Sequence, residues 1–126
     1  MGLRADIETY FNANWATGTG GTEPNWHNAD LGTGKGLPLC LMTENVSDPE
    51  PVAKSAGGTL YKYEQTCALE YHCTDRTDAE KKETETKRLV RAKSVTSGWW
   101  EIGPADYLEQ QKFCILKIDV KEVKWA

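Results

Sequence analysis

The side chains best suited to chemistry in this chain are its four cysteines and two histidines, because thiolates and imidazoles serve as nucleophiles, acid–base groups and metal ligands. They are Cys40, Cys67, Cys73, Cys114, His27 and His72. No Cys-x-x-Cys pair occurs, and on an extended strand His72 points to the opposite face from Cys67 and Cys73, which argues against a zinc site. All four cysteines have apolar neighbours, so we expect four reduced thiols in a core rather than two disulfides.

His27 stands between Trp26 and Asn28 and is the histidine best placed for acid–base work. No serine, aspartate or cysteine around it has a recognisable nucleophile context, so we expect an interface or structural role. The glycine-rich run 32–36 contains a lysine, as phosphate-binding loops do, but a glycine follows that lysine where a hydroxyl residue is needed. The run also leads into a predicted strand, which makes it a turn. We therefore expect no catalytic residue, no metal and no cofactor.

Length and composition are those of one globular domain, because the chain has 126 residues, of which 39% are hydrophobic and 27% are charged. We expect residues 1–126 to fold as a single domain. No apolar run approaches the ~20 residues that cross a bilayer, so no membrane partner is expected. The net charge of −4 argues against nucleic-acid binding by the whole surface. The first twenty residues lack the pattern of a secretion signal, which favours a cytosolic origin.

The elements that must position these residues begin with a helix. Ile7, Phe11 and Trp15 recur at i, i+4 spacing and predict an amphipathic helix that ends before the glycines at 18–21. The segment 18–36 is predicted to be a long loop, for which two interpretations are open. It is either a contact arm ordered by a partner or a mobile surface loop.

Three strands are predicted from hydrophobic patterning. An apolar run at 37–42 favours an inner strand, and strict alternation over 60–73 favours a long strand with one polar face. A loop is expected between them at 47–58, where proline and glycine are frequent. The last strand covers 113–125, and its alternation shifts at Glu122, which predicts a bulge or a strand that leaves the sheet there.

A capping box at Thr77–Glu80 predicts a charged helix over about 78–93, whose apolar residues come late and whose packing should be loose. A short strand at 99–102 follows. Strands in succession with helices indicate an α+β fold of two layers. We expect a mixed or antiparallel sheet of about four strands, with the N-terminal helix and the charged helix packed on one face.

The basic end of that helix has three open interpretations: it contacts a neighbouring subunit or a ring lumen, neutralises phosphates, or lies in solvent. Tryptophan is enriched at interfaces, and several tryptophans are expected to be exposed here. The candidate interface residues are Trp26, His27, Lys87, Arg88, Arg91, Lys93, Trp99 and Trp100.

The order of elements resembles that of the tail terminator and tail-completion (head–tail joining) proteins of long-tailed phages and related archaeal viruses. The likeness consists of an amphipathic helix, a glycine-rich loop, a buried strand, a tyrosine-rich strand, a charged helix and a long final strand. No motif supports it, so no functional residue carries over.

This resemblance implies a non-enzymatic virion structural protein, made in the host cytoplasm. Such a protein forms a ring homo-oligomer, usually a hexamer. Its partners are tail tube and neck proteins, and nucleic acid is present only as it passes through the lumen of the ring. The alternative is a small cytosolic protein-interaction or ligand-binding module. A small enzyme with a loop-borne site around His27 is a further alternative.

Overall fold

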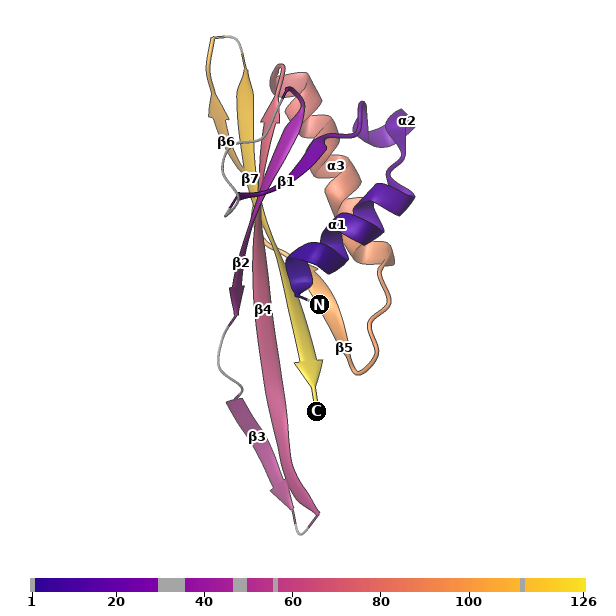
Figure 1. Ribbon diagram of the computed structural model, residues 1–126, viewed down its shortest axis with the longest axis vertical. Helices are drawn as coiled ribbons and strands as arrows, with labels where there is room; N and C mark the ends of the chain where they lie inside the picture. Colours follow the sequence, from indigo (N-terminus) through magenta and orange to yellow (C-terminus); the bar gives the residue numbers. More distant parts are fainter. Residues whose placement is uncertain (1, 30–35, 47–49, 56, 112) are drawn as a thin grey trace.

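The chain forms one mixed β-sheet whose helices lie on one face (Figure 1). The computed structural model describes residues 2–29, 36–46, 50–55, 57–111 and 113–126. Within these ranges the helices are α1 (Leu3–Asn14), α2 (Thr17–Gly20) and α3 (Arg76–Ala92). The strands are β1 (Asn25–Asn28), β2 (Leu39–Val46), β3 (Glu50–Ser55), β4 (Gly58–Cys73), β5 (Gly98–Ile102), β6 (Asp106–Glu109) and β7 (Cys114–Trp125).

The sheet is built around two long central strands. Its order is β1-β2-β4-β7-β5, while β3 pairs with the first part of β4 and β6 with the first part of β7. Pairing is antiparallel except between β1 and β2, and β4 pairs with β7 from Lys62–Trp125 to Cys73–Cys114. The α+β prediction is therefore confirmed, but the sheet has seven strands among the described residues, where about four were expected.

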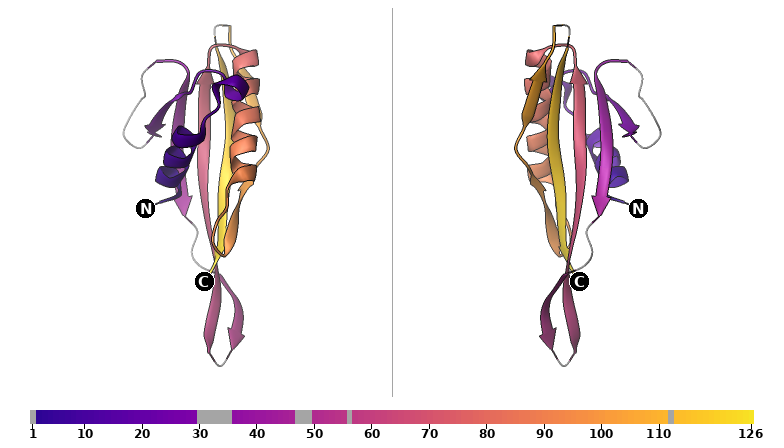
Figure 2. Two further views of the ribbon diagram at one scale, coloured as in Figure 1. Left: turned by 90° about the vertical axis from the view of Figure 1, so that its right-hand side faces the viewer. Right: turned by 90° about the vertical axis from the view of Figure 1, so that its left-hand side faces the viewer.

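One face of the sheet carries the core. Alternation sends Cys67, Leu69 and Tyr71 of β4 toward the helices, where they are buried beside Phe11 of α1 and Leu89 of α3. Burying a large apolar side chain contributes about 1.5–3 kcal/mol, so this inner face holds the two layers together. Figure 2 shows α1 and α3 over the inner face in one view and the uncovered outer face of β2, β4 and β7 in the other.

The start of α1 is fixed by side chains of the sheet. The backbone N–H of Leu3 donates to Glu44 Oε1 at 2.7 Å and to Gln65 Oε1 at 3.2 Å. A carboxylate at this position also interacts favourably with the positive end of the helix dipole. A Cβ on Gly2 would lie 2.4 Å from Glu44 Oε1, so a larger residue here would push the Glu44 carboxylate away from its bond with Leu3 N–H. These contacts set the place of α1 on the inner face.

Two segments predicted to be loops contain regular structure. In 18–36, α2 extends into the segment and β1 gains its hydrogen bonds from β2, with Asn25 N–H donating to the carbonyl of Pro38 at 2.9 Å. In 47–58, β3 pairs with β4, and Pro51 is tolerated because β3 is an edge strand. Residues 30–35, which include most of the glycine-rich run, and residues 47–49 lie outside the described ranges.

Two local predictions are corrected. Helix α3 is capped by Asp75, whose carboxylate accepts from Asp78 N–H at 2.8 Å, so the predicted capping box at Thr77 is not the start. The predicted bulge at Glu122 is absent from the described β4–β7 pairing, which keeps one register throughout. Glu122 stays on the inner face because Trp100 Nε1–H donates to its Oε2 at 2.7 Å.

Candidate functional site

A hairpin projects beyond the helices and exposes apolar side chains. We call β3 together with residues 58–63 of β4 the arm; Figures 1 and 2 show it extending past both termini. Val52 and Leu60 are each 42% exposed, and Tyr61 and Tyr63 are each 37% exposed. Because an isolated two-stranded hairpin has no core of its own, these side chains have nothing within the subunit to pack against fully.

The edge of the arm is poorly suited to pairing with another strand. Pro51 lacks an N–H, and the β3–β4 register shifts between Pro51 and Ala53. Lys54, which is exposed, adds a charge at the same edge. Proline, a shift in register and an exposed lysine are features that prevent another strand from adding to an edge strand. The arm therefore offers side chains, rather than backbone, for contact.

An aromatic pair lies on the outer face beside the base of the arm. Trp99 is 43% exposed, and its ring centroid lies 6.2 Å from that of Trp125. Lys62 Nζ lies 5.9 Å from the centroid of the Trp125 ring. The predicted exposure of Trp99 is therefore confirmed, and apolar surface is present on both sides of the sheet near the arm.

A groove crosses the inner face between α1 and β5. We call it the α1–β5 groove; it has a volume of about 550 Å³. A second hollow of about 450 Å³ adjoins it and reaches Tyr63 at the base of the arm; the residues that line both are Asp6, Thr96, Glu122 and Lys124. The residues that line the α1–β5 groove are Asp6, Thr9, Tyr10, Ala13, Asn14, Lys93, Ser94, Val95, Thr96, Trp100, Glu122 and Lys124.

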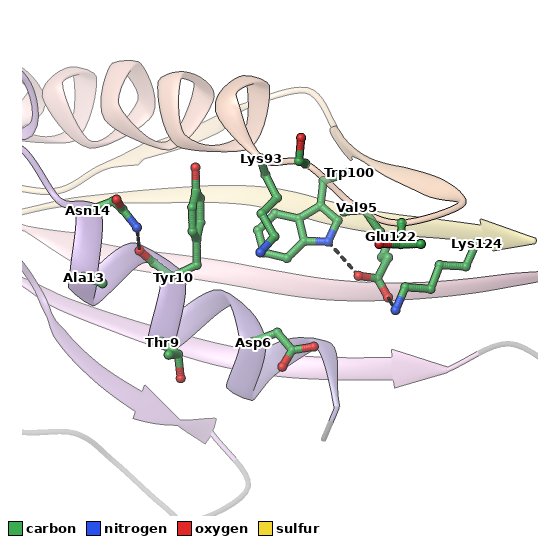
Figure 3. A pocket seen from close by; sticks show the side chains of 12 residues that line it. Asp6, Thr9, Tyr10, Ala13, Asn14, Lys93, Val95, Trp100, Glu122 and Lys124 are labelled. Carbon is green, nitrogen blue, oxygen red and sulfur yellow. Dashed lines mark hydrogen bonds and ion pairs between the residues drawn. The ribbon is translucent and has the colours of Figure 1, made fainter.

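The floor of the groove is aromatic and its charges are largely matched (Figure 3). The rings of Tyr10 and Trp100 meet edge-to-face at 5.7 Å. Lys93 Nζ lies 4.7 Å from the first ring centroid and 5.1 Å from the second, a cation–π geometry that contributes about 0.5–1 kcal/mol. Glu122 accepts from Trp100 and has Lys124 Nζ 3.6 Å from its Oε1. The groove thus has an apolar floor with polar walls.

The structure corrects the predicted exposure of two tryptophans. Trp100 is only 7% exposed and forms the groove floor. Trp26 is partly buried, with its ring centroid 5.7 Å from those of Phe11 and Trp15, and its Nε1–H donates to Glu23 Oε2 at 2.9 Å. It covers the core rather than forming a free contact surface.

The basic end of α3 does not form one continuous patch. Lys87 pairs with Glu83 at 2.5 Å, and Arg88 donates to Glu85 through Nε at 2.7 Å and through a terminal nitrogen at 2.6 Å. Arg91 is exposed, whereas Lys93 turns into the groove. Three of the four predicted interface cations are thus engaged within the subunit, Lys87 and Arg88 in ion pairs and Lys93 over two aromatic rings.

Buried charges on α3 were not foreseen from the sequence. Lys82 is fully buried and donates to the carbonyl of Gly20 at 2.8 Å and to Asp78 Oδ1 at 2.7 Å. Glu85 is also fully buried and accepts the backbone N–H of Ala16 at 2.5 Å. The Glu85 carboxylate thus fixes the N-terminal end of α2, and the Lys82 ammonium fixes its C-terminal end. The prediction that α3 packs loosely is wrong, because polar side chains of α3 are buried where it packs against α2.

Glu85 remains a good acceptor despite its burial. Burial acts to raise the pKa of its carboxyl group, but hydrogen bonds from Arg88 and from the Ala16 N–H outweigh it, so the net pKa is lowered. The hydrogen bond to Glu85 in turn raises the pKa of Arg88. The Arg88 guanidinium also donates to the carbonyl of Asn14 at 2.9 Å, which ties the end of α1 to α3.

The four cysteines lie on the inner face of the sheet, whereas His27 lies on the outer face. His27 lies in β1 opposite Leu41, on the face away from Trp26 and the groove. The four cysteines are free and buried, and burial raises the pKa of Cys67 and of Cys73 to about 12. Thiols with raised pKa values are poor nucleophiles. Among the described residues, no group of three or more His, Cys, Asp or Glu side chains is placed to hold a metal ion.

The outer face of the sheet is a ladder of paired charges. Glu64 lies 2.8 Å from Lys62 and 3.2 Å from Lys121, and these hydrogen bonds lower the pKa of its carboxyl group. Glu70 and Lys117 extend the ladder at 3.7 Å. The central part of this face is thus typical of a solvated surface.

No match was found for the chain among protein-family models or among curated proteins. In the parts of the chain that the structure describes, the helices are too short or too polar to cross a membrane. The arm and the α1–β5 groove are therefore the features from which a function is argued.

Proposed function

We propose that this protein is a non-enzymatic virion structural protein that assembles with copies of itself into a ring on a phage-type tail tube. A tail terminator, tail-completion or neck position fits this role. The single observation that carries the assembly is the arm, because it exposes Val52 and Leu60 beyond the helices and Tyr61 and Tyr63 at its base. Exposed apolar patches mark contact sites in soluble proteins.

The subunit carries two different surfaces that allow a ring. The arm and the α1–β5 groove lie on one chain, and a head-to-tail contact between two such surfaces leaves each copy with one free partner site. Such head-to-tail contacts close into rings when the rotation between copies permits it. The tail position and a hexameric copy number come from the resemblance in the order of elements.

The charge distribution favours protein partners over nucleic acid. Lys87 and Arg88 are paired within the subunit, so fewer cations at the end of α3 are available to phosphates. Tail tube and neck proteins are the partners of the proposal, and nucleic acid is expected only as it passes through the lumen. The protein is then found in the virion after synthesis in the host cytoplasm.

The experiment compares two matched serine variants. Leu60→Ser removes an exposed apolar side chain from the arm, and Leu108→Ser removes one that is 51% exposed on β6, at the other end of the sheet. Electron microscopy of the negatively stained wild-type chain should show annular particles, which Leu60→Ser loses and Leu108→Ser keeps. Particles unaffected by Leu60→Ser would remove the arm from the proposal.

The second candidate function is a small ligand-binding or protein-interaction module. The observation that favours it is the α1–β5 groove, whose volume of about 550 Å³ lies within the ~300–1,000 Å³ typical of small-molecule sites. A chain that stays monomeric and binds a small molecule over Trp100 would support this candidate instead.

A further inference from the structure

We propose that the arm of one copy inserts its apolar side chains into the α1–β5 groove of the next copy. This inference rests on the proposed function, because it names the contact through which the copies of a ring join. The occupant of the groove is then a second copy of this chain, and the groove and the arm are two halves of one interface.

The arm cannot fill the groove of its own subunit. The groove reaches the base of the arm at Tyr63, whereas the arm runs away from the helices (Figure 1). Strand β4 continues unbroken from the arm at Gly58 into the core at Cys73. Folding the arm back would break the pairing of Lys62 with Trp125 and of its neighbours with β7. The two surfaces can therefore meet only between different copies.

The two surfaces match in polarity. The arm presents Val52 and Leu60, and the groove floor presents the half-buried ring of Tyr10 and the small exposed part of Trp100, with the Lys93 side chain over both rings. Aromatic residues seated in a desolvated pocket dominate the affinity of protein interfaces. A groove of about 550 Å³ has room for a few side chains, which is what a narrow hairpin delivers.

One pair of charges on the two surfaces also matches. Among the described residues, Lys54 on the arm and Asp6 on the groove wall make no ion pair, whereas Lys124 is beside Glu122 and Lys93 is held over two rings. Within the described ranges Glu50, also on the arm, makes no ion pair either, so the match in charge is between Lys54 and Asp6 and does not extend to the whole arm. Opposite charges at an interface set its register and speed association.

The irregular edge of the arm agrees with this mode of contact. Because Pro51 and the register shift beside it oppose strand addition, the arm is expected to bind through side chains. Insertion of side chains into a groove is binding of this kind. Extension of the sheet from copy to copy along β3 would instead need strand addition at this edge.

The decisive experiment mixes two variants that each keep one half of the interface. The double variant Val52→Ser/Leu60→Ser keeps the groove and loses the arm, while Thr9→Trp keeps the arm and fills the groove from α1. We expect each variant alone to sediment as a monomer. We expect the mixture to form a 1:1 dimer that does not grow, because the dimer has no second working pair of surfaces.

The outcomes separate this inference from the proposed function. If the wild-type chain forms rings and Thr9→Trp assembles as well as the wild type, the groove contact is overturned but the proposed ring is not. A monomeric wild-type chain would overturn both. A mixture that stays monomeric would show that arm and groove do not bind each other. Ala13→Trp, also on the groove wall, repeats the block should Thr9→Trp unfold, which its circular dichroism melt reveals.

A charge exchange tests the same contact by a second route. Lys54→Glu and Asp6→Lys should each weaken assembly about fivefold, and the combined variant should recover most of the loss. Lys81→Glu is the matched control, because Lys81 is exposed on α3 and lies outside the groove lining. Additive losses in the combined variant would contradict a direct contact between Lys54 and Asp6.

Discussion

Replacing Glu85 with alanine tests the observation that buried charges of α3 hold the end of α1 and the whole of α2. The substitution removes the acceptor of the Ala16 N–H at 2.5 Å and the partner of Arg88. A hydrogen bond to a charged group contributes about 1.5–3 kcal/mol, and the N–H of Ala16 would lose its partner in a partly buried place. Because Arg88 is 44% exposed at its side chain, water compensates part of its loss.

We therefore expect Glu85→Ala to lower the free energy of unfolding by about 2–3 kcal/mol, which corresponds to a fall in Tm of roughly 8–12 °C for a chain of this length. Urea unfolding at a fixed protein concentration measures it. The matched control is Glu80→Ala, since Glu80 lies on the same helix with a 60% exposed side chain 3.4 Å from Arg76. A loss in Glu85→Ala no larger than that in Glu80→Ala would refute the structural role of the buried carboxylate.

The same residue makes a prediction about pH. The pKa of Glu85 is lowered in the folded protein from its ordinary value of 4.5, because the bonds from Arg88 and Ala16 outweigh burial. A carboxyl group of this kind contributes stability above its unfolded pKa and loses it as the pH falls through the folded pKa. The difference in unfolding free energy between wild type and Glu85→Gln should be largest at neutral pH and shrink below about pH 4.5.

Three further predictions follow from close packing, burial and surface charge. Gly20→Ala should lower the free energy of unfolding by about 1–3 kcal/mol, because its Cβ would lie 2.5 Å from Trp15 Cζ2. Gly18→Ala is the control, since its Cβ would have no atom within 4 Å and the free energy of unfolding should change little. Chemical denaturation measures both. Thiol titration should find four slow groups in native protein and four fast ones after denaturation without reductant, and recovery of two or none would indicate disulfides. Arg91→Glu should leave DNA retention at physiological salt unchanged, and tight wild-type binding that this variant abolishes would favour a nucleic-acid function.

Local patterns predicted the parts of the fold that depend on neighbouring residues. The alternation of Cys67, Leu69 and Tyr71 placed them on one face of a long strand, and the spacing of Ile7 and Phe11 placed them on the buried face of α1. The short strands β1 and β3 were missed because they are polar or contain proline, and each forms only through its pairing partner in β2 or β4.

The candidate site was less visible in the sequence, for physical reasons that particular residues illustrate. The burial of Lys82 and Glu85 depends on α2 lying across α3, which no helical periodicity reveals. Trp100 was taken as exposed along with Trp99, although strand alternation sends adjacent residues to opposite faces and could have distinguished them. The β3 half of the arm was predicted as a loop, while Leu60, Tyr61 and Tyr63 were placed in the predicted strand 60–73, so the hairpin and its exposed apolar residues were not recognised as a surface.

The measurement that tests the central claim most directly is the native mass of the unmodified chain in solution, taken by native mass spectrometry beside that of Leu60→Ser. The proposal predicts a single closed species of several copies, six by the resemblance in the order of elements, which falls to the monomer mass of 14.1 kDa in Leu60→Ser. A wild-type chain that is monomeric at every concentration tested would contradict it.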